Sequence, residues 1–60
     1  MKAKTWFRAQ GQRMADLGLP LQASPLWASR NVMPYWAYLA FTSGFEDVRS
    51  AKAMRQGAST

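Results

Sequence analysis

Apolar residues recur at every third or fourth position in two long segments of this chain, which is typical of amphipathic helices. In the first segment one stripe of a helical wheel holds Ala3, Phe7, Gly11, Met14 and Leu17. Gly18 and Pro20 follow as a stop signal, because glycine takes the left-handed position after a helix and proline cannot continue one. The pattern predicts a first helix over residues 3 to 17.

The second segment carries the stronger apolar stripe, and Pro34 is suited to its first turn. Residues 43 to 46 also fit a capping box, so a separate helix could begin there. Because the apolar face keeps its phase across that point, we expect one helix from about 34 to 55, kinked or loosened near Gly44, and a frayed tail over 56 to 60. The stripe consists of Ala37, Tyr38, Phe41, Phe45 and Val48, together with Gly44.

Between the helices, residues 18 to 33 form a connector in which glycine and proline interrupt any long period. Ser24 and Pro25 are a good N-cap and first residue for one short helical turn. The expected fold is all-α: a two-helix antiparallel hairpin forming a single domain over residues 1 to 60. Gly11 and Gly44 would allow the backbones to approach closely; the alternative is that each is a tolerated defect costing about 1 kcal/mol relative to alanine.

Composition argues against catalysis and for an anionic partner. The chain has 60 residues, no Cys, no His and a formal net charge of +5, so no disulfide or thiolate metal site is expected and polyanions should be attracted. The carboxylates are Asp16, Glu46 and Asp47, and the adjacent pair diverges by about 100° on a helix. We expect no enzyme activity, no metal and no cofactor, and a cytoplasmic location. The longest apolar stretch is broken by Pro34 and Gly44, so no transmembrane segment is expected.

The basic residues form two clusters, one in each predicted helix. An antiparallel hairpin would place the start of the first helix beside the end of the second and merge both clusters into one phosphate-binding patch. For the second cluster, compensation of the helix dipole is an equally good explanation. The candidate RNA-binding residues are Lys4, Arg8, Arg13, Arg49, Lys52 and Arg55.

Three tryptophans lie off or at the edge of the apolar stripes. At least one should therefore be exposed and able to stack on an unpaired base, with Trp6 and Trp36 as the candidates. In so small a chain, however, aromatic rings supply much of the buried area. We therefore expect about two of the three tryptophans, Trp6, Trp27 and Trp36, to pack in the core.

Gly11, Gly18 and Pro25 recur at intervals of seven and precede an aromatic-x-x-Gly-aromatic motif, Phe41 to Phe45 with Gly44. This pattern, over residues 8 to 51, resembles the bacterial ribosome modulation factor family. Leu26 stands where the family usually has a tyrosine, phenylalanines replace two tryptophans, and extra residues precede Phe41. The resemblance implies a two-helix protein that binds the ribosomal RNA of the small subunit and blocks initiation. It also implies that these glycine, proline and phenylalanine positions shape the fold.

Two other functions remain open. The chain could be a small inhibitor from a mobile element that docks an apolar helix face on an acidic protein partner of its host, since two short helices have difficulty burying three tryptophans. It could also be an interfacial membrane peptide anchored by Trp36, Tyr38 and Leu39.

Overall fold

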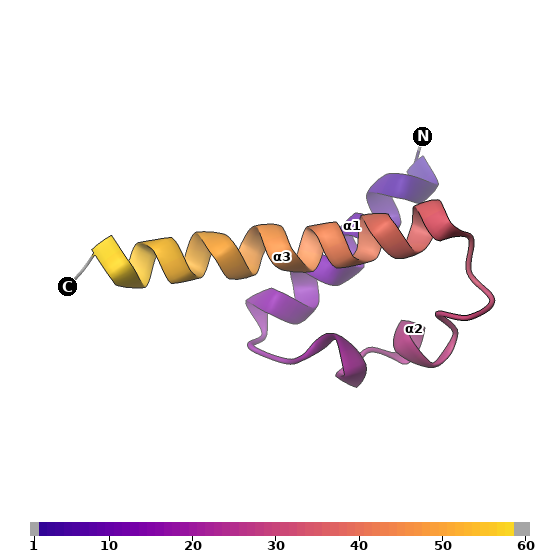
Figure 1. Ribbon diagram of the computed structural model, residues 1–60, viewed down its shortest axis with the longest axis horizontal. Helices are drawn as coiled ribbons and strands as arrows, with labels where there is room; N and C mark the ends of the chain where they lie inside the picture. The colour runs from indigo at the N-terminus through magenta and orange to yellow at the C-terminus, as the bar shows by residue number, and fades with distance from the viewer. Residues whose placement is uncertain (1, 59–60) are drawn as a thin grey trace.

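The computed structural model describes residues 2–58, with side chains from residue 3 to residue 55, and this part of the chain is helical without strands. Two long α-helices lie on each other, and the connector between them folds beneath the longer one (Figure 1). The elements in chain order are α1 (Lys2–Asp16), a 3₁₀ turn (Leu21–Ala23), α2 (Pro25–Ala28) and α3 (Tyr35–Ala58). The predicted all-α fold of two packed helices joined by a connector with a helical turn is confirmed.

The helix ends follow the local signals in the sequence. Gly18 has a φ of 72°, and a Schellman motif closes α1: the Leu19 N–H donates to the Met14 carbonyl at 3.0 Å and the Gly18 N–H to the Ala15 carbonyl at 3.1 Å. At the start of α2, the Ser24 hydroxyl oxygen accepts a hydrogen bond from the Leu26 N–H at 3.2 Å, and Pro25 occupies the first turn.

Helix α3 is continuous, although the sequence also allowed a separate helix to begin at residues 43 to 46. It passes through Ser43 and Gly44 without interruption and extends to Ala58, three residues beyond the predicted end. Residues 56 to 58, predicted to fray, are therefore helical, and the rest of that tail lies outside the described residues.

The predicted antiparallel direction is wrong: α1 and α3 cross while running in the same general direction (Figure 1). Near the start of both helices the rings of Phe7 and Trp36 lie 5.7 Å apart, and at the end of α1 the Lys52 ammonium reaches the Ala15 carbonyl at 2.9 Å. Residues later in α1 therefore contact residues later in α3, as expected when two helices run in the same direction. The connector permits this direction because it is long enough to return the chain along the full length of α1 before α3 begins.

Glycine at two positions allows the helices to cross backbone to backbone. A Cβ atom added at Gly11 would overlap the Phe41 carbonyl and lie 2.8 Å from the Phe45 nitrogen. One added at Gly44 would overlap the Arg8 carbonyl. The prediction of close approach at both glycines is thus confirmed, and the reading of either as a mere defect is not needed.

A small core surrounds this crossing. Phe41 is fully buried, and around it are small residues that keep the helices close. The predicted stripe of α3 faces inward, but Ala3 and Leu17 at the two ends of the α1 stripe are exposed because the helices diverge on either side of the crossing. The buried hydrophobic residues are Met14, Ala15, Ala37, Ala40 and Phe41.

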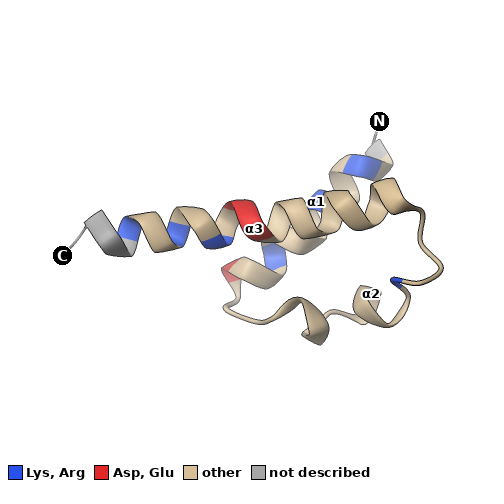
Figure 2. Ribbon diagram, viewed as in Figure 1, with Lys and Arg blue, Asp and Glu red and all other residues tan. Residues whose placement is uncertain are grey.

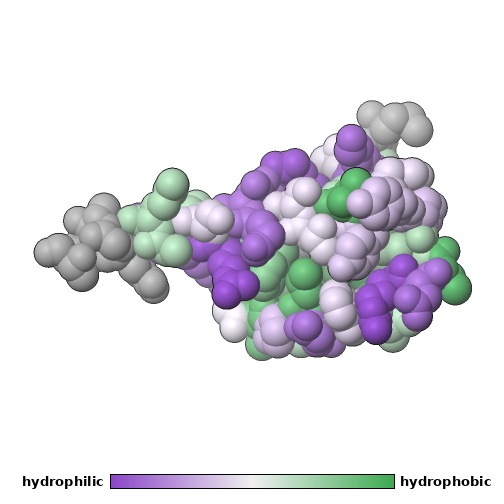
Figure 3. Space-filling model, viewed as in Figure 1, coloured by the Kyte–Doolittle hydropathy of each residue, from purple (hydrophilic) through white to green (hydrophobic). Residues whose placement is uncertain are grey.

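The ends of the molecule differ as a result of the crossing. The last turns of α3 project beyond α1 as a free helix, while the first turns of α1 and α3 lie together at the other end (Figures 1 and 3). Within residues 2–58, no helix has the length and apolar character needed to cross a membrane.

We predict that Gly11→Ala and Gly44→Ala each lower the free energy of unfolding by roughly 1–3 kcal/mol, since the new methyl group must push two backbones apart. At an ordinary helical site the same change stabilises by about 1 kcal/mol. Urea unfolding followed by circular dichroism measures the effect, with the exposed Ser50→Ala as the control. Stabilisation by either glycine substitution would contradict the close crossing.

Candidate nucleic-acid interface

The predicted basic patch does not form, because the same-direction crossing separates its two halves. Lys4 lies near the start of α1, whereas Arg49, Lys52 and Arg55 lie toward the opposite end of the molecule (Figure 2). Along α3, Trp36 and Arg55 are about 28 Å apart at 1.5 Å per residue. The six candidate residues therefore divide into separate groups and cannot contact one compact phosphate cluster.

Two of the six candidates are engaged within the fold. The Arg8 guanidinium forms an ion pair with Asp47 that links α1 to α3, and both side chains are half exposed. The Lys52 ammonium donates to the carbonyl oxygens of Ala15 and Asp16, each at 2.9 Å. These are the final carbonyls of α1, so Lys52 caps the negative end of that helix. The sequence predicted neither contact: Arg8 was expected to bind phosphate, and Lys52 to bind phosphate or compensate the dipole of its own helix rather than that of α1.

The remaining four candidates are exposed. Arg49 has a loose partner, Glu46, three residues earlier on the same helix, with the guanidinium nitrogen 3.9 Å from the carboxylate oxygen. Such exposed pairs contribute little to stability and open readily. Lys4 lies near the start of α1, Arg13 in the last turn of α1 and Arg55 in the last turn of α3, and all three side chains are exposed.

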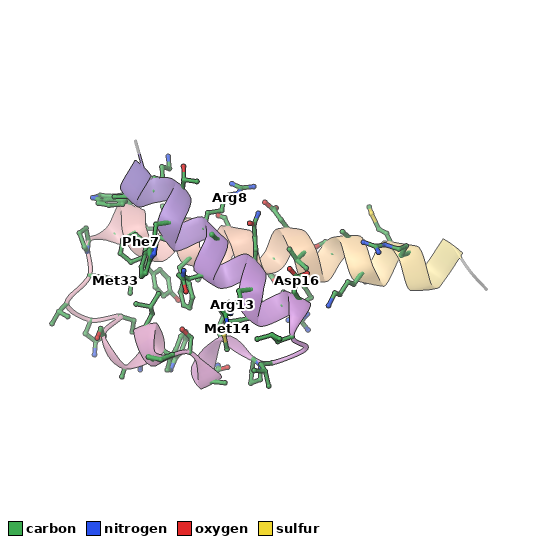
Figure 4. All side chains as sticks on the ribbon, turned by 180° about the vertical axis from the view of Figure 1, so that it is seen from behind. Phe7, Arg8, Arg13, Met14, Asp16 and Met33 are labelled. Carbon is green, nitrogen blue, oxygen red and sulfur yellow. The ribbon has the colours of Figure 1, made fainter. Side chains whose placement is uncertain are left out.

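At the start of the two long helices lies a cluster that we call the aromatic end: Trp6 and Phe7 of α1 with Tyr35 and Trp36 of α3. The Phe7 ring meets Trp6 edge-on at 5.0 Å and Trp36 edge-on at 5.7 Å between centroids. Phe7 is half-buried and points from α1 toward the segment that carries Met33 (Figure 4). Phe7 therefore contacts both tryptophans.

Both candidate stacking residues are exposed, which confirms that at least one tryptophan lies at the surface. Trp6 is 50% exposed and Trp36 is 45% exposed. The expectation that most tryptophans pack in the core is wrong, since Trp27 is also only half-buried. The physical reason is the small contact region around the glycines, which leaves too little interior for three indole rings.

Trp27 has its own cation. The Arg30 guanidinium carbon lies 4.5 Å from the centre of the Trp27 ring, and the same side chain donates to the Trp27 carbonyl at 2.8 Å. Sequence analysis did not consider Arg30, although its spacing of three from Trp27 was a usable signal. Arg30 therefore caps the short helix α2, and its guanidinium is engaged with Trp27.

The aromatic end carries positive charge without a carboxylate beside it. All three acids of the chain, Asp16, Glu46 and Asp47, lie at the crossing or at the end of α1. Lys4 lies one turn before Arg8 and is exposed because it precedes the crossing. The parallel helix starts of α1 and α3 add partial positive charge at this same end.

The six residues on which the predicted resemblance to ribosome modulation factors rests take structural positions. Gly11 and Gly44 form the crossing, Gly18 ends α1, Pro25 begins α2 and Phe41 fills the core. The sixth, Phe45, is half-buried and lines an open hollow beside the connector.

We predict that Lys52→Ala lowers the free energy of unfolding by about 1 kcal/mol, because two carbonyls at the end of α1 lose their charged donor. Arg55→Ala, one turn further along α3 on an exposed site, should change it by less than about 0.5 kcal/mol. Chemical denaturation of the two variants side by side makes the comparison. Equal effects would remove the capping role of Lys52.

Comparison of the chain with models of known families, with curated proteins and with solved structures gave no match. The likeness to ribosome modulation factors therefore stays a prediction from the sequence.

Proposed function

We propose that this chain is a small cytoplasmic RNA-binding protein that docks on the ribosomal RNA of the small subunit and inhibits translation. The observation that carries the proposal is the aromatic end, where Trp6 and Trp36 each contact the Phe7 ring and expose about half of their surface. Indole faces held in this way stack on unpaired bases of any sequence.

Cations supply the second part of the interaction. We call the segment of α3 from Arg49 to Arg55 the basic arm; it starts beside the end of α1, where Lys52 contacts the last carbonyls of that helix, continues beyond it and contains no acid. Arg49 and Arg55 are exposed there, and Lys4 is exposed at the aromatic end. A ligand that reaches from Trp36 to Arg49, where the basic arm begins, must span about 20 Å, and about 28 Å if it also contacts Arg55. It must also be negatively charged along its length. Folded RNA with an unpaired stretch meets both conditions.

The alternative partner is a protein that accepts an apolar surface. Trp36 and Leu39 lie three residues apart on α3, and Leu39 is 44% exposed. An acidic protein with an apolar groove could cover them while pairing with Lys4. Treatment with nuclease separates the two functions, because an RNA complex is lost and a protein complex survives.

We expect the purified protein to co-sediment with small ribosomal subunits in a sucrose gradient at low salt and to dissociate as salt rises. The reason is that each phosphate contact releases counterions, so affinity falls steeply with ionic strength. Immunoblotting across gradient fractions is the measurement. Absence from the small-subunit fractions at low salt would overturn the ribosomal proposal.

Replacing both exposed tryptophans, Trp6→Ala with Trp36→Ala, should weaken binding to a labelled single-stranded RNA by at least about tenfold, since each stacked base contributes about 1–3 kcal/mol. Val32→Ala is the matched control: Val32 is 84% exposed and lies in the connector, so affinity should be unchanged. Fluorescence anisotropy measures both, and circular dichroism checks that the variants remain helical. Unchanged affinity of the double variant would rule out stacking at the aromatic end.

A further inference from the structure

A groove runs between the connector and α3, away from the aromatic end, and consists of two adjoining hollows. The larger hollow has a volume of about 670 Å³ and the smaller one about 290 Å³. Pro20, Phe45 and Arg49 line both. Hydrophobic side chains of the connector side lie next to hydrophilic ones at the start of the projecting helix (Figure 3).

The larger hollow suits an anion next to an apolar surface. Arg49 and Lys52 line it together with Leu19 and the half-buried Phe45. Lys52 uses two of its three ammonium protons on the carbonyls of α1, so one donor remains. The Arg49 side chain is 71% exposed and held only by the loose pair with Glu46, so it can turn toward a phosphate.

The smaller hollow offers polar groups suited to the edge of a base. Gln22, Thr42 and Glu46 line it. The Thr42 hydroxyl donates to the Tyr38 carbonyl at 3.0 Å, which leaves its oxygen free to accept. The Glu46 carboxylate can accept two parallel hydrogen bonds from neighbouring N–H groups. Among the bases, guanine presents two such donors side by side, N1–H and the N2 amino group, on its Watson–Crick edge.

We propose that this groove binds one unpaired guanine nucleotide of the RNA, an inference that rests on the proposed RNA binding. The phosphate lies in the larger hollow against Arg49 and Lys52, and the base lies in the smaller hollow with its Watson–Crick edge on Glu46. The ring of Phe45 and the flat face of Pro20, shared by both hollows, provide the surface against which the nucleotide packs.

The test compares two labelled nine-nucleotide RNAs, one of uridine only and one with guanosine at the centre, by fluorescence anisotropy. The guanosine RNA should bind about tenfold more tightly, as a good bidentate contact to a base provides. Glu46→Gln replaces one acceptor oxygen with an amino group and should reduce this preference to less than twofold without weakening binding of the uridine RNA.

Asp16→Asn is the matched control, because it removes the same charge from an exposed position outside the groove and should leave the guanosine preference intact. Equal binding of the two RNAs, or a preference that persists in Glu46→Gln, would overturn the guanine site while leaving RNA binding in place. Failure of both RNAs to bind the unaltered protein would instead overturn the proposed function and the guanine site with it.

Discussion

The structure depends on one contact, the crossing of α1 and α3 at Gly11 and Gly44. Without a side chain at either position, backbone meets backbone, and only small residues and the single ring of Phe41 are needed to fill the space around it. A crossing this close brings only a short length of each helix into contact. The helices diverge within a few turns, so Trp6 and Trp36 emerge at one end and the last turns of α3 project at the other. The surfaces proposed to bind RNA are direct consequences of where the two glycines lie.

Charge is arranged around the same crossing. Asp47 neutralises Arg8 between the helices, and Glu46 lies beside Arg49 one turn further on. Lys52 compensates the carbonyl end of α1, an arrangement possible only because that end faces the middle of α3. The acids are thus concentrated where the helices meet. Unpaired positive charge is left toward the two ends, and a ligand must be long to use both.

Local features of the fold were predictable from the sequence, and the direction of packing was not. The stop at Gly18, the cap at Ser24 and the unbroken phase of α3 each depend on a few neighbouring residues, and all three appear as expected. The apolar stripes, in contrast, show which face of each helix is buried but are the same for antiparallel and same-direction packing. The connector is long enough for either direction, so its length does not distinguish them. The contacts of Arg8 and Lys52 across the crossing followed from that direction and could not be foreseen without it.

The half-buried Phe45 connects the helix crossing with the groove and, through Arg49, with the basic arm. Its backbone nitrogen lies against Gly11 at the crossing, and its ring lines the groove beside the connector. Arg49, one turn later, belongs both to that groove and to the basic arm. A nucleotide held at Phe45 would therefore lead its neighbouring phosphates directly onto the arm, whereas the aromatic end is separated from the groove by the length of the crossing. An RNA that fits this protein should present two unpaired sites with a gap between them, which is a property of a folded RNA rather than of a short flexible strand.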